Sequence, residues 1–149
     1  MRKAVMPATA SMRRKRSRGA AMMELALLSP WIFFLFIGVL DSGFYAYSFI
    51  TLETATRSAA AWNSNHATPN DAAYACTVVT NEMQTLVNMT GISTCGGTSP
   101  VSLTATQITG PDNEQAAQVS VTYTTPRLIP IPGLLASQFT LTRVVVMKL

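Results

Sequence analysis

Residues 13–40 read RRKRSRGAAMMELALLSPWIFFLFIGVL, and this stretch decides the architecture of the chain. A basic run ends at Gly19, and four small or apolar residues then lead to a single carboxylate, Glu24. Sixteen residues without a charge follow, from Leu25 to Leu40. Such a run predicts a helix inside a membrane, where a carboxylate near the bilayer centre costs roughly 2.5–3.5 kcal/mol. The presence of Glu24 at the mouth of this helix therefore indicates a functional carboxylate.

The excess positive charge of the chain lies entirely at its N-terminal end. Residues 1–19 hold seven of the eleven basic residues and no acidic one, whereas residues 20–149 hold four basic and seven acidic residues. A basic block beside an apolar segment predicts that the block stays in the cytoplasm. Because the remainder has no basic stripe to contact phosphates, the distribution argues against nucleic-acid binding.

Residues 20–62 are predicted to form one long helix, with a transmembrane part at about residues 25–48. Sixteen residues rise about 24 Å, short of a hydrocarbon core of about 30 Å, so the span extends past Asp41 or into residues 20–23. Four aromatic residues follow: Phe44, Tyr45, Tyr47 and Phe49. They fit either an interfacial aromatic belt or a helix face that packs against a C-terminal domain.

A second, short helix is predicted after residue 67. Thr68 is a suitable cap, Pro69 fits the first helical position, and Asp71 suits the positive end of the helix dipole. One face of this helix is then predicted at helical spacing, and Gly91 is a natural stop. The residues of this face are Ala75, Val79, Met83, Leu86 and Thr90.

The rest of the chain has the alternating pattern of β-strands. Three segments alternate apolar and polar residues, namely 101–106, 119–124 and 139–148. Residues 110–113 predict a turn between the first two strands, and residues 126–133 form a proline-rich connection. We therefore predict an α+β fold in which a small antiparallel sheet is covered on one face by helix. The expected parts are a basic leader at 1–19, a helix at 20–62 and an extracytoplasmic domain at 63–149.

The two cysteines, Cys76 and Cys95, are predicted to form a disulfide. Both follow the apolar segment, on the side opposite the basic block, so the topology places them outside the cytoplasm, where a disulfide persists. The bridge would close a loop of about twenty residues and contribute about 3 kcal/mol. The alternative is a pair of free buried thiols. No cysteine or histidine spacing indicates a metal site.

No constellation in the sequence indicates an enzyme. His66 is the sole histidine and lies in a polar linker, where an exposed bystander is the expected role. The chain has no glycine-rich phosphate loop and no HExxH motif, and its acidic residues are scattered singly. We therefore expect no catalytic residue, no metal and no cofactor.

The N-terminal part of the chain carries a characteristic pattern of small, apolar and acidic residues. It comprises residues 18–27, then Pro30, Gly38, Asp41 and Gly43, then Ala55, Arg57, Ala59 and Ala60. This pattern resembles the TadE-like pseudopilins of tight-adherence (Flp, type IVc) pilus systems. The family usually has Glu-Phe-Ala where Glu24-Leu25-Ala26 stands, and Glu where Asp41 stands. The resemblance is strong over residues 18–62 and loose beyond them.

The resemblance implies that a prepilin peptidase cuts the bond between Gly19 and Ala20. Glu24 would then be the fifth residue of the mature chain and would pair with the α-ammonium of a neighbouring subunit. Because an unpaired charge is costly at low dielectric, that pair would set the register of an assembly. The plainer alternative is that Glu24 stabilises the positive end of its own helix.

The predicted function is that of a non-enzymatic pseudopilin or minor pilin. Its expected partners are the prepilin peptidase, other pilin subunits, pilus assembly proteins and the lipid membrane. The chain would cross the bacterial inner membrane once, with a cytoplasmic N-terminus and a periplasmic domain, and would enter a pilus. Three alternatives remain: an uncleaved signal-anchored periplasmic scaffold of a secretion or pilus machine, a secreted domain released near residues 46–48, and a membrane-tethered hydrolase.

Overall fold

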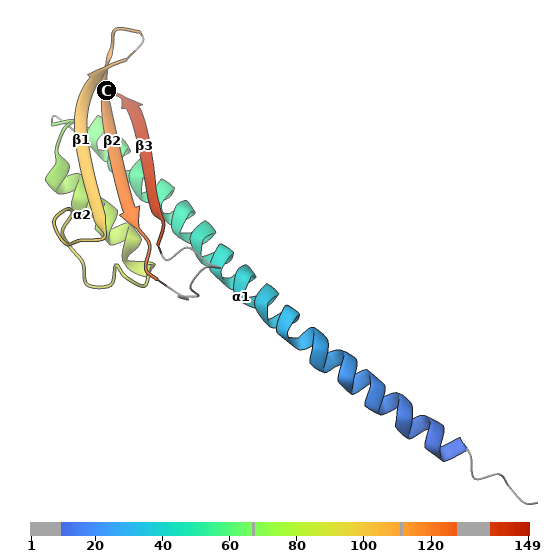
Figure 1. Cartoon of the computed structure of the whole chain (residues 1–149). Coiled ribbons are helices and arrows are strands. Elements are labelled where there is room, and N and C mark those ends of the chain that lie inside the picture. Colours follow the sequence, from blue (N-terminus) through green and yellow to red (C-terminus); the bar gives the residue numbers. More distant parts are fainter. Residues whose placement is uncertain (1–9, 67, 111, 128–137) are drawn as a thin grey trace, which may run out of the picture. The chain divides into compact units, whose positions relative to one another are not determined.

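The structure is a computed structural model that describes residues 10–66, 68–110, 112–127 and 138–149. Its elements, in chain order, are the helices α1 (Ala10–Ser64) and α2 (Ala72–Glu82), the 3-10 turn η1 (Met83–Thr85), and the strands β1 (Val101–Thr109), β2 (Gln115–Thr124) and β3 (Thr140–Lys148) (Figure 1). The predicted α+β class, with a long helix, a short helix and a small sheet, is confirmed.

The chain divides into two compact units, Met1–Leu40 and Asp41–Leu149, and α1 contributes residues to both. The described helix begins at Ala10 rather than at Ala20, and it continues through Pro30. Residues 10–19, the second half of the expected basic leader, are therefore helical. In the second unit, the end of α1 packs with α2 and the sheet.

The sheet is antiparallel throughout, with the order β1-β2-β3 (Figure 1). In the central strand, Val119, Val121 and Tyr123 are fully buried and alternate with partly exposed polar residues. The alternation that predicted the strands therefore also identifies the face that packs on the helices. Two strands are longer than expected: β1 continues to Thr109, and β2 begins at Gln115, which pairs with Thr109.

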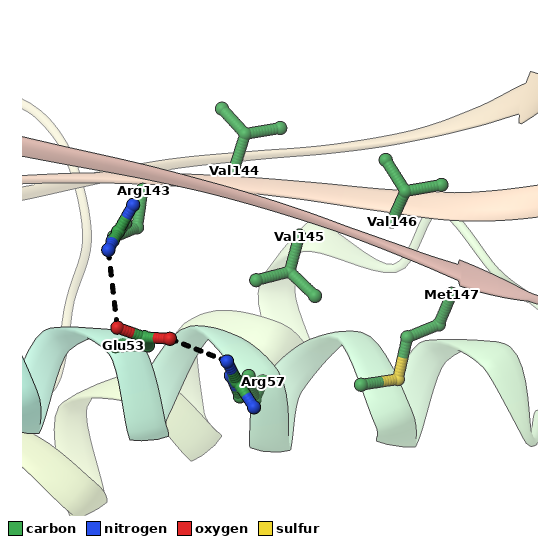
Figure 2. Close-up of a pocket in the computed structure, with 7 residues that line it drawn as sticks. All are labelled: Glu53, Arg57, Arg143, Val144, Val145, Val146 and Met147. Atoms are coloured by element: carbon green, nitrogen blue, oxygen red, sulfur yellow. Dashed lines mark hydrogen bonds and ion pairs between the residues drawn. The ribbon is translucent and has the colours of Figure 1, made fainter.

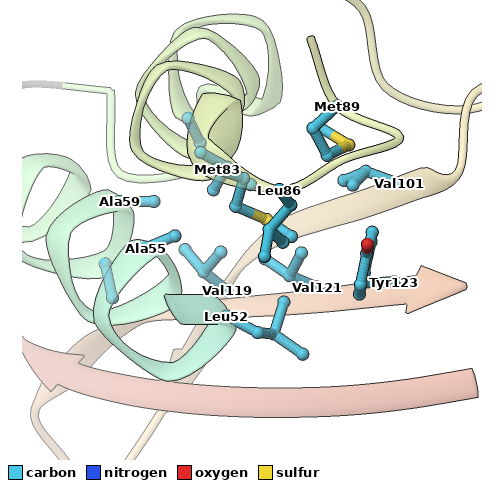
Figure 3. Close-up of a cluster of buried hydrophobic side chains, with 13 residues drawn as sticks. Leu52, Ala55, Ala59, Met83, Leu86, Met89, Val101, Val119, Val121 and Tyr123 are labelled. Carbon is cyan, nitrogen blue, oxygen red and sulfur yellow. The ribbon is translucent and has the colours of Figure 1, made fainter. Parts of the chain in front are cut away.

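The core lies where the end of α1 meets the short helix and the sheet (Figure 3). Leu52, Ala55 and Ala59 of α1 are fully buried, and the small alanine side chains allow close approach of neighbouring elements. Thirteen buried residues make up this cluster: Leu52, Ala55, Ala59, Ala60, Ala75, Val79, Met83, Leu86, Met89, Val101, Val119, Val121 and Tyr123. Each large aliphatic member contributes about 1.5–3 kcal/mol by burial.

The start of α2 differs from the prediction. Asp71, not Thr68, is the N-cap: its backbone is extended, and Oδ1 accepts a hydrogen bond from the backbone N–H of Tyr74 at 3.0 Å. The carboxylate satisfies one of the donors that the first helical turn leaves free, and it carries the charge that the helix dipole favours there. The cap is therefore the last of the polar residues before the helix rather than the first.

The end of α2 also comes earlier than predicted. The helix stops at Glu82, η1 follows, and the backbone becomes extended at Leu86 instead of continuing to Gly91. This early turn buries Met89, whereas Thr90, which the helical pattern placed on the inner face, is exposed. Burial of a methionine in place of a threonine favours the turn, because the larger apolar surface leaves water.

Two connections bracket the central strand. The turn between β1 and β2 forms where predicted: Gly110 N–H donates to Glu114 O at 2.8 Å, and Asn113 takes the positive φ of 61° that such a turn demands. Pro111 within that turn lies outside the described residues, as do residues 128–133 of the proline-rich connection.

A buried polar pair joins the segment after η1 to the sheet. The Tyr123 hydroxyl donates to Oδ1 of Asn88, and Nδ2 of Asn88 donates to the Thr124 carbonyl at 3.0 Å. Burial raises the pKa of Tyr123 to about 12, so the phenol stays protonated and remains a donor. Asn88 thus holds its segment against β2.

The structure contains the Cys76–Cys95 disulfide expected from the sequence, with the two Cα atoms 5.9 Å apart. Cys76 lies on α2 and Cys95 lies in the loop that leads to β1, 19 residues later. The bridge therefore ties the short helix to the entry of the sheet.

Candidate functional site

The first unit presents an apolar surface on every side. Apart from Ile37, which is partly buried, the large hydrophobic side chains from Leu25 to Leu40 are at least half exposed, including Leu27 at 77% and Trp31 at 71%. Exposure of so many apolar side chains to water is unfavourable, whereas a bilayer solvates them. The helix from Gly19 to Ser64 is long and apolar enough to cross a membrane. These features are consistent with one membrane span near the N-terminus.

The predicted cleavage and register residues lie on the exposed start of this segment. Gly19, Ala20 and Glu24 are all helical and exposed. A Cβ atom placed on Gly19 would meet nothing within 4 Å, so a larger side chain fits there without disturbing the helix. Glu24 follows Ala20 by four residues, and the two therefore share a helix face. Among the residues from Gly19 onward whose side chains the structure describes, Glu24 has no ion-pair partner.

The aromatic residues beyond Asp41 pack inside the second unit, against its C-terminal part. The Tyr45 ring meets the Phe139 ring edge-on with centroids 4.6 Å apart, and the Tyr47 hydroxyl donates to Thr85 Oγ1 at 3.1 Å. The guanidinium of Arg143 lies 4.3 Å above the Phe49 ring. Of the two roles left open by the sequence, domain packing is the one these side chains perform.

A charged cluster joins α1 to β3 farther along the helix (Figure 2). One Glu53 oxygen accepts from Arg57 at 2.6 Å, and the other accepts from Arg143 at 3.2 Å. Together with residues 144–147, the three side chains line a cleft of about 450 Å³. Two guanidinium groups share one carboxylate, so the cleft keeps an excess positive charge.

Sequence reasoning did not identify this cluster. Glu53 and Arg57 are four residues apart on a helix, a spacing typical of an ion pair. The stronger signal was Arg143, a charged residue on the inward face of a strand whose other inward residues are apolar. A cation at such a position calls for a carboxylate on the element that covers the strand.

The arginine contacts of Glu53 predict an acid-sensitive contribution to stability. The hydrogen bond from Arg57, reinforced by the charge of Arg143, lowers the pKa of Glu53 below its ordinary value. A carboxyl group with a lowered folded-state pKa stabilises the fold above its unfolded-state pKa and loses that contribution as the pH falls through the folded-state value. We expect the free energy of unfolding to fall modestly below about pH 5, and Glu53→Gln to flatten this dependence.

Denaturant unfolding between about pH 3 and pH 7 measures this effect. Glu82→Gln is the matched control, since Glu82 is an exposed helical carboxylate without an ion pair in the described residues. Identical pH profiles for Glu53→Gln and the unchanged chain would contradict the assignment.

The sole histidine takes part in an aromatic stack. The Trp62 ring is stacked between those of His66 and Tyr74, with centroid distances of 3.8 Å and 3.7 Å. His66 is exposed, as expected, and its Nδ1 lies 2.8 Å from the Trp62 carbonyl oxygen. The stack joins the end of α1 to the first turn of α2. The described residues contain no group of three or more metal-ligating side chains.

A comparison with protein families finds a match to part of α1. Residues 19–61 match a family model described as TadE-like protein. The match begins at Gly19 and covers the apolar segment, Asp41 and the helical half of the charged cluster. No curated protein and no solved structure matches the chain.

Proposed function

We propose that this chain is a pseudopilin or minor pilin subunit with a role in the Tad pilus system, because residues 19–61 match the family model described as TadE-like protein. The observation that carries the proposal is that the family match begins at Gly19 and covers the part of α1 that exposes apolar side chains on all sides. Such a helix suits first a membrane and then a bundle of like helices. Its expected contribution is to the assembly of a tight-adherence pilus.

In this proposal a prepilin peptidase removes the basic leader at residues 1–19. The scissile bond lies between Gly19 and Ala20, on an exposed stretch of helix that a protease can reach. The basic leader stays in the cytoplasm, the segment at about residues 25–48 spans the inner membrane, and the domain from residue 63 onward lies in the periplasm. The disulfide is compatible with this side of the membrane, because bridges persist in oxidising compartments.

Glu24 is the proposed register residue of the assembled form. Cleavage creates an α-ammonium on Ala20, and Glu24 of a neighbouring subunit neutralises it. An unpaired charge in an apolar helix bundle is costly, so only subunit positions that join the two charges are favoured. The exposure of Glu24 and its lack of an ion pair in the described part of this chain support a role toward another chain.

N-terminal sequencing of the membrane-extracted protein, with and without the host's prepilin peptidase, tests the proposal. We expect a start at Ala20 that depends on the peptidase, and full loss of processing in Gly19→Leu. Since nothing lies within 4 Å of a Cβ atom at Gly19, that variant keeps its helix and alters the peptidase site alone.

Two results of this sequencing would overturn the proposal. A start at Met1 in the presence of the peptidase would favour an uncleaved periplasmic scaffold. A start near Phe49 would identify a conventional signal peptide and a released domain.

A further inference from the structure

The last strand has a free hydrogen-bonding edge. Leu149 N–H donates to Gln115 O, and Phe139 O accepts from Thr125 N–H. The backbone N–H and C=O groups of the odd-numbered residues from 139 to 149 therefore point toward β2. Because antiparallel strands alternate the direction of their backbone groups, the N–H and C=O of Thr142, Val144 and Val146 point away from the sheet. The described residues place no further strand beside them.

The side chains on this edge are apolar, unlike those on the opposite edge. Val144 and Val146 are 52% and 51% exposed. At the other edge, the exposed residues of β1 are mainly serine and threonine, and the Val101 carbonyl already accepts a hydrogen bond from Gly96 N–H at 2.7 Å. Proteins normally protect open strand edges with charge, proline or a covering element, so an open valine edge indicates a surface that pairs.

The charged cleft lies directly under this edge. Figure 2 shows Val144 and Val146 on the side of β3 away from α1, and Val145 and Met147 on the side toward it. The Arg57 side chain is 65% exposed and that of Arg143 is 38% exposed, so both remain accessible to an added group. A strand paired with β3 would place every second side chain on the same face of the sheet as these two guanidinium groups.

We propose that the free edge of β3 binds an extended segment of a second protein, which adds a strand to the sheet and places a carboxylate over Arg57 and Arg143. The backbone of β3 supplies the affinity through main-chain hydrogen bonds, and the valines and arginines supply the selectivity. Apolar residues of the added strand cover Val144 and Val146, and an acidic residue on the inner side neutralises the excess charge of the cleft.

A second copy of this chain does not fit the edge. α1 and β3 run in the same direction, since Tyr45 meets Phe139 and the later Glu53 meets Arg143. Antiparallel pairing of two β3 strands would put the two Asp41 ends, from which the apolar segments continue, at opposite ends of the joint sheet. Two chains in one membrane cannot be arranged in this way. The β1 edge of a copy would run parallel, but β1 contains no acidic residue.

The full chain in detergent micelles, titrated with two synthetic peptides, tests the proposal. Both peptides have the length of β3 and alternate valine with threonine; one has glutamate at the central inward position and the other has lysine. We expect the glutamate peptide to slow hydrogen exchange at the Val144 and Val146 amides and to bind roughly tenfold more tightly than the lysine peptide. The difference should shrink at high salt.

Proline substitutions supply the matched control. Val146→Pro removes an outward N–H of β3, and Gln107→Pro removes an outward N–H of β1; neither breaks a main-chain hydrogen bond to β2, and Gln107→Pro removes only the exposed side-chain hydrogen bond from Gln107 to Gln115. We expect the first to weaken peptide binding at least fivefold and the second to leave it unchanged. Equal binding of both peptides would overturn the proposal. Amides of Val144 and Val146 already protected in the free protein would show instead that the chain, or a second copy of it, covers its own edge.

Discussion

We expect replacement of Glu24 by alanine to leave the proposed cleavage after Gly19 intact and to reduce incorporation into pili by roughly tenfold or more. In the proposed assembly the carboxylate acts only once subunits meet, where it pairs with the α-ammonium of a neighbouring Ala20. Its loss leaves that ammonium unpaired in an apolar bundle, a penalty of several kcal/mol per contact. Immunoblots of sheared pili against the membrane fraction measure the ratio of incorporated to retained protein.

The direction of this effect separates assembly from membrane insertion. Removal of a carboxylate makes an apolar segment easier to insert, by up to about 3 kcal/mol near the bilayer centre. A defective Glu24→Ala variant therefore cannot be explained by failed insertion. Glu82→Ala, a carboxylate removed from an exposed site on α2, is the control and should assemble normally. Normal piliation by Glu24→Ala would leave the carboxylate with a purely local role at the start of its helix.

The elements of the fold could be predicted because each has a simple period. The alternation in β2 identified Val119, Val121 and Tyr123 as the inner face, and all three are fully buried. Leu52, Ala55 and Ala59 likewise recur in the sequence at the spacing of one helix face, and all three are fully buried. These patterns report burial on one side of an element, which a single sequence records directly.

The ends of α2 could not be predicted in the same way. Thr68 and Asp71 are both good capping residues, and only the backbone conformation before Ala72 decides between them. At the other end, Met89 and Thr90 compete for one place in the core, and the extended backbone at Leu86 decides in favour of the methionine. Both choices depend on the position of the sheet, which local sequence does not encode.

The sequence indicates candidate residues in the first unit, and it does not indicate the charged cluster of the second. Gly19 and Glu24 stand out because charge and glycine interrupt a membrane-like run. The contact between Glu53 and Arg143 joins residues 90 positions apart, and no local pattern connects them. The family match ends at residue 61, so it includes the helical half of this cluster and not the strand half. The pairing surface on β3 is therefore a property of the fold rather than of the family pattern.

Replacement of both cysteines by serine should lower the free energy of unfolding by about 3 kcal/mol. The disulfide closes a segment with a sequence separation of 19, and its loss frees the unfolded chain to explore more conformations. For a domain of this size the loss corresponds to a decrease in Tm of roughly 10–15 °C. Thermal unfolding of the full chain in detergent, followed by near-ultraviolet circular dichroism of the stacked Trp62, measures it.

The reduced natural protein is the control for the serine variant. If the bridge is the whole cause, reduction of the natural chain should lower Tm by the same amount, and further reductant should not affect the serine variant. Free-thiol labelling of both Cys76 and Cys95 in the unreduced, membrane-extracted protein would contradict the presence of the bridge.

The same bridge provides a test of topology that does not depend on pili. A thiol pair on the cytoplasmic side stays reduced, whereas one beyond the membrane becomes oxidised. In a host that lacks its periplasmic thiol oxidase, we expect Cys76 and Cys95 to be recovered largely as thiols and the protein to lose stability by the amount measured for the serine variant. An unchanged, fully oxidised pair in that host would show that the bridge does not report the compartment. A pair that is reduced even in the normal host would argue for a domain on the cytoplasmic side. That result would contradict the proposed topology and, with it, the proposed cleavage at Gly19.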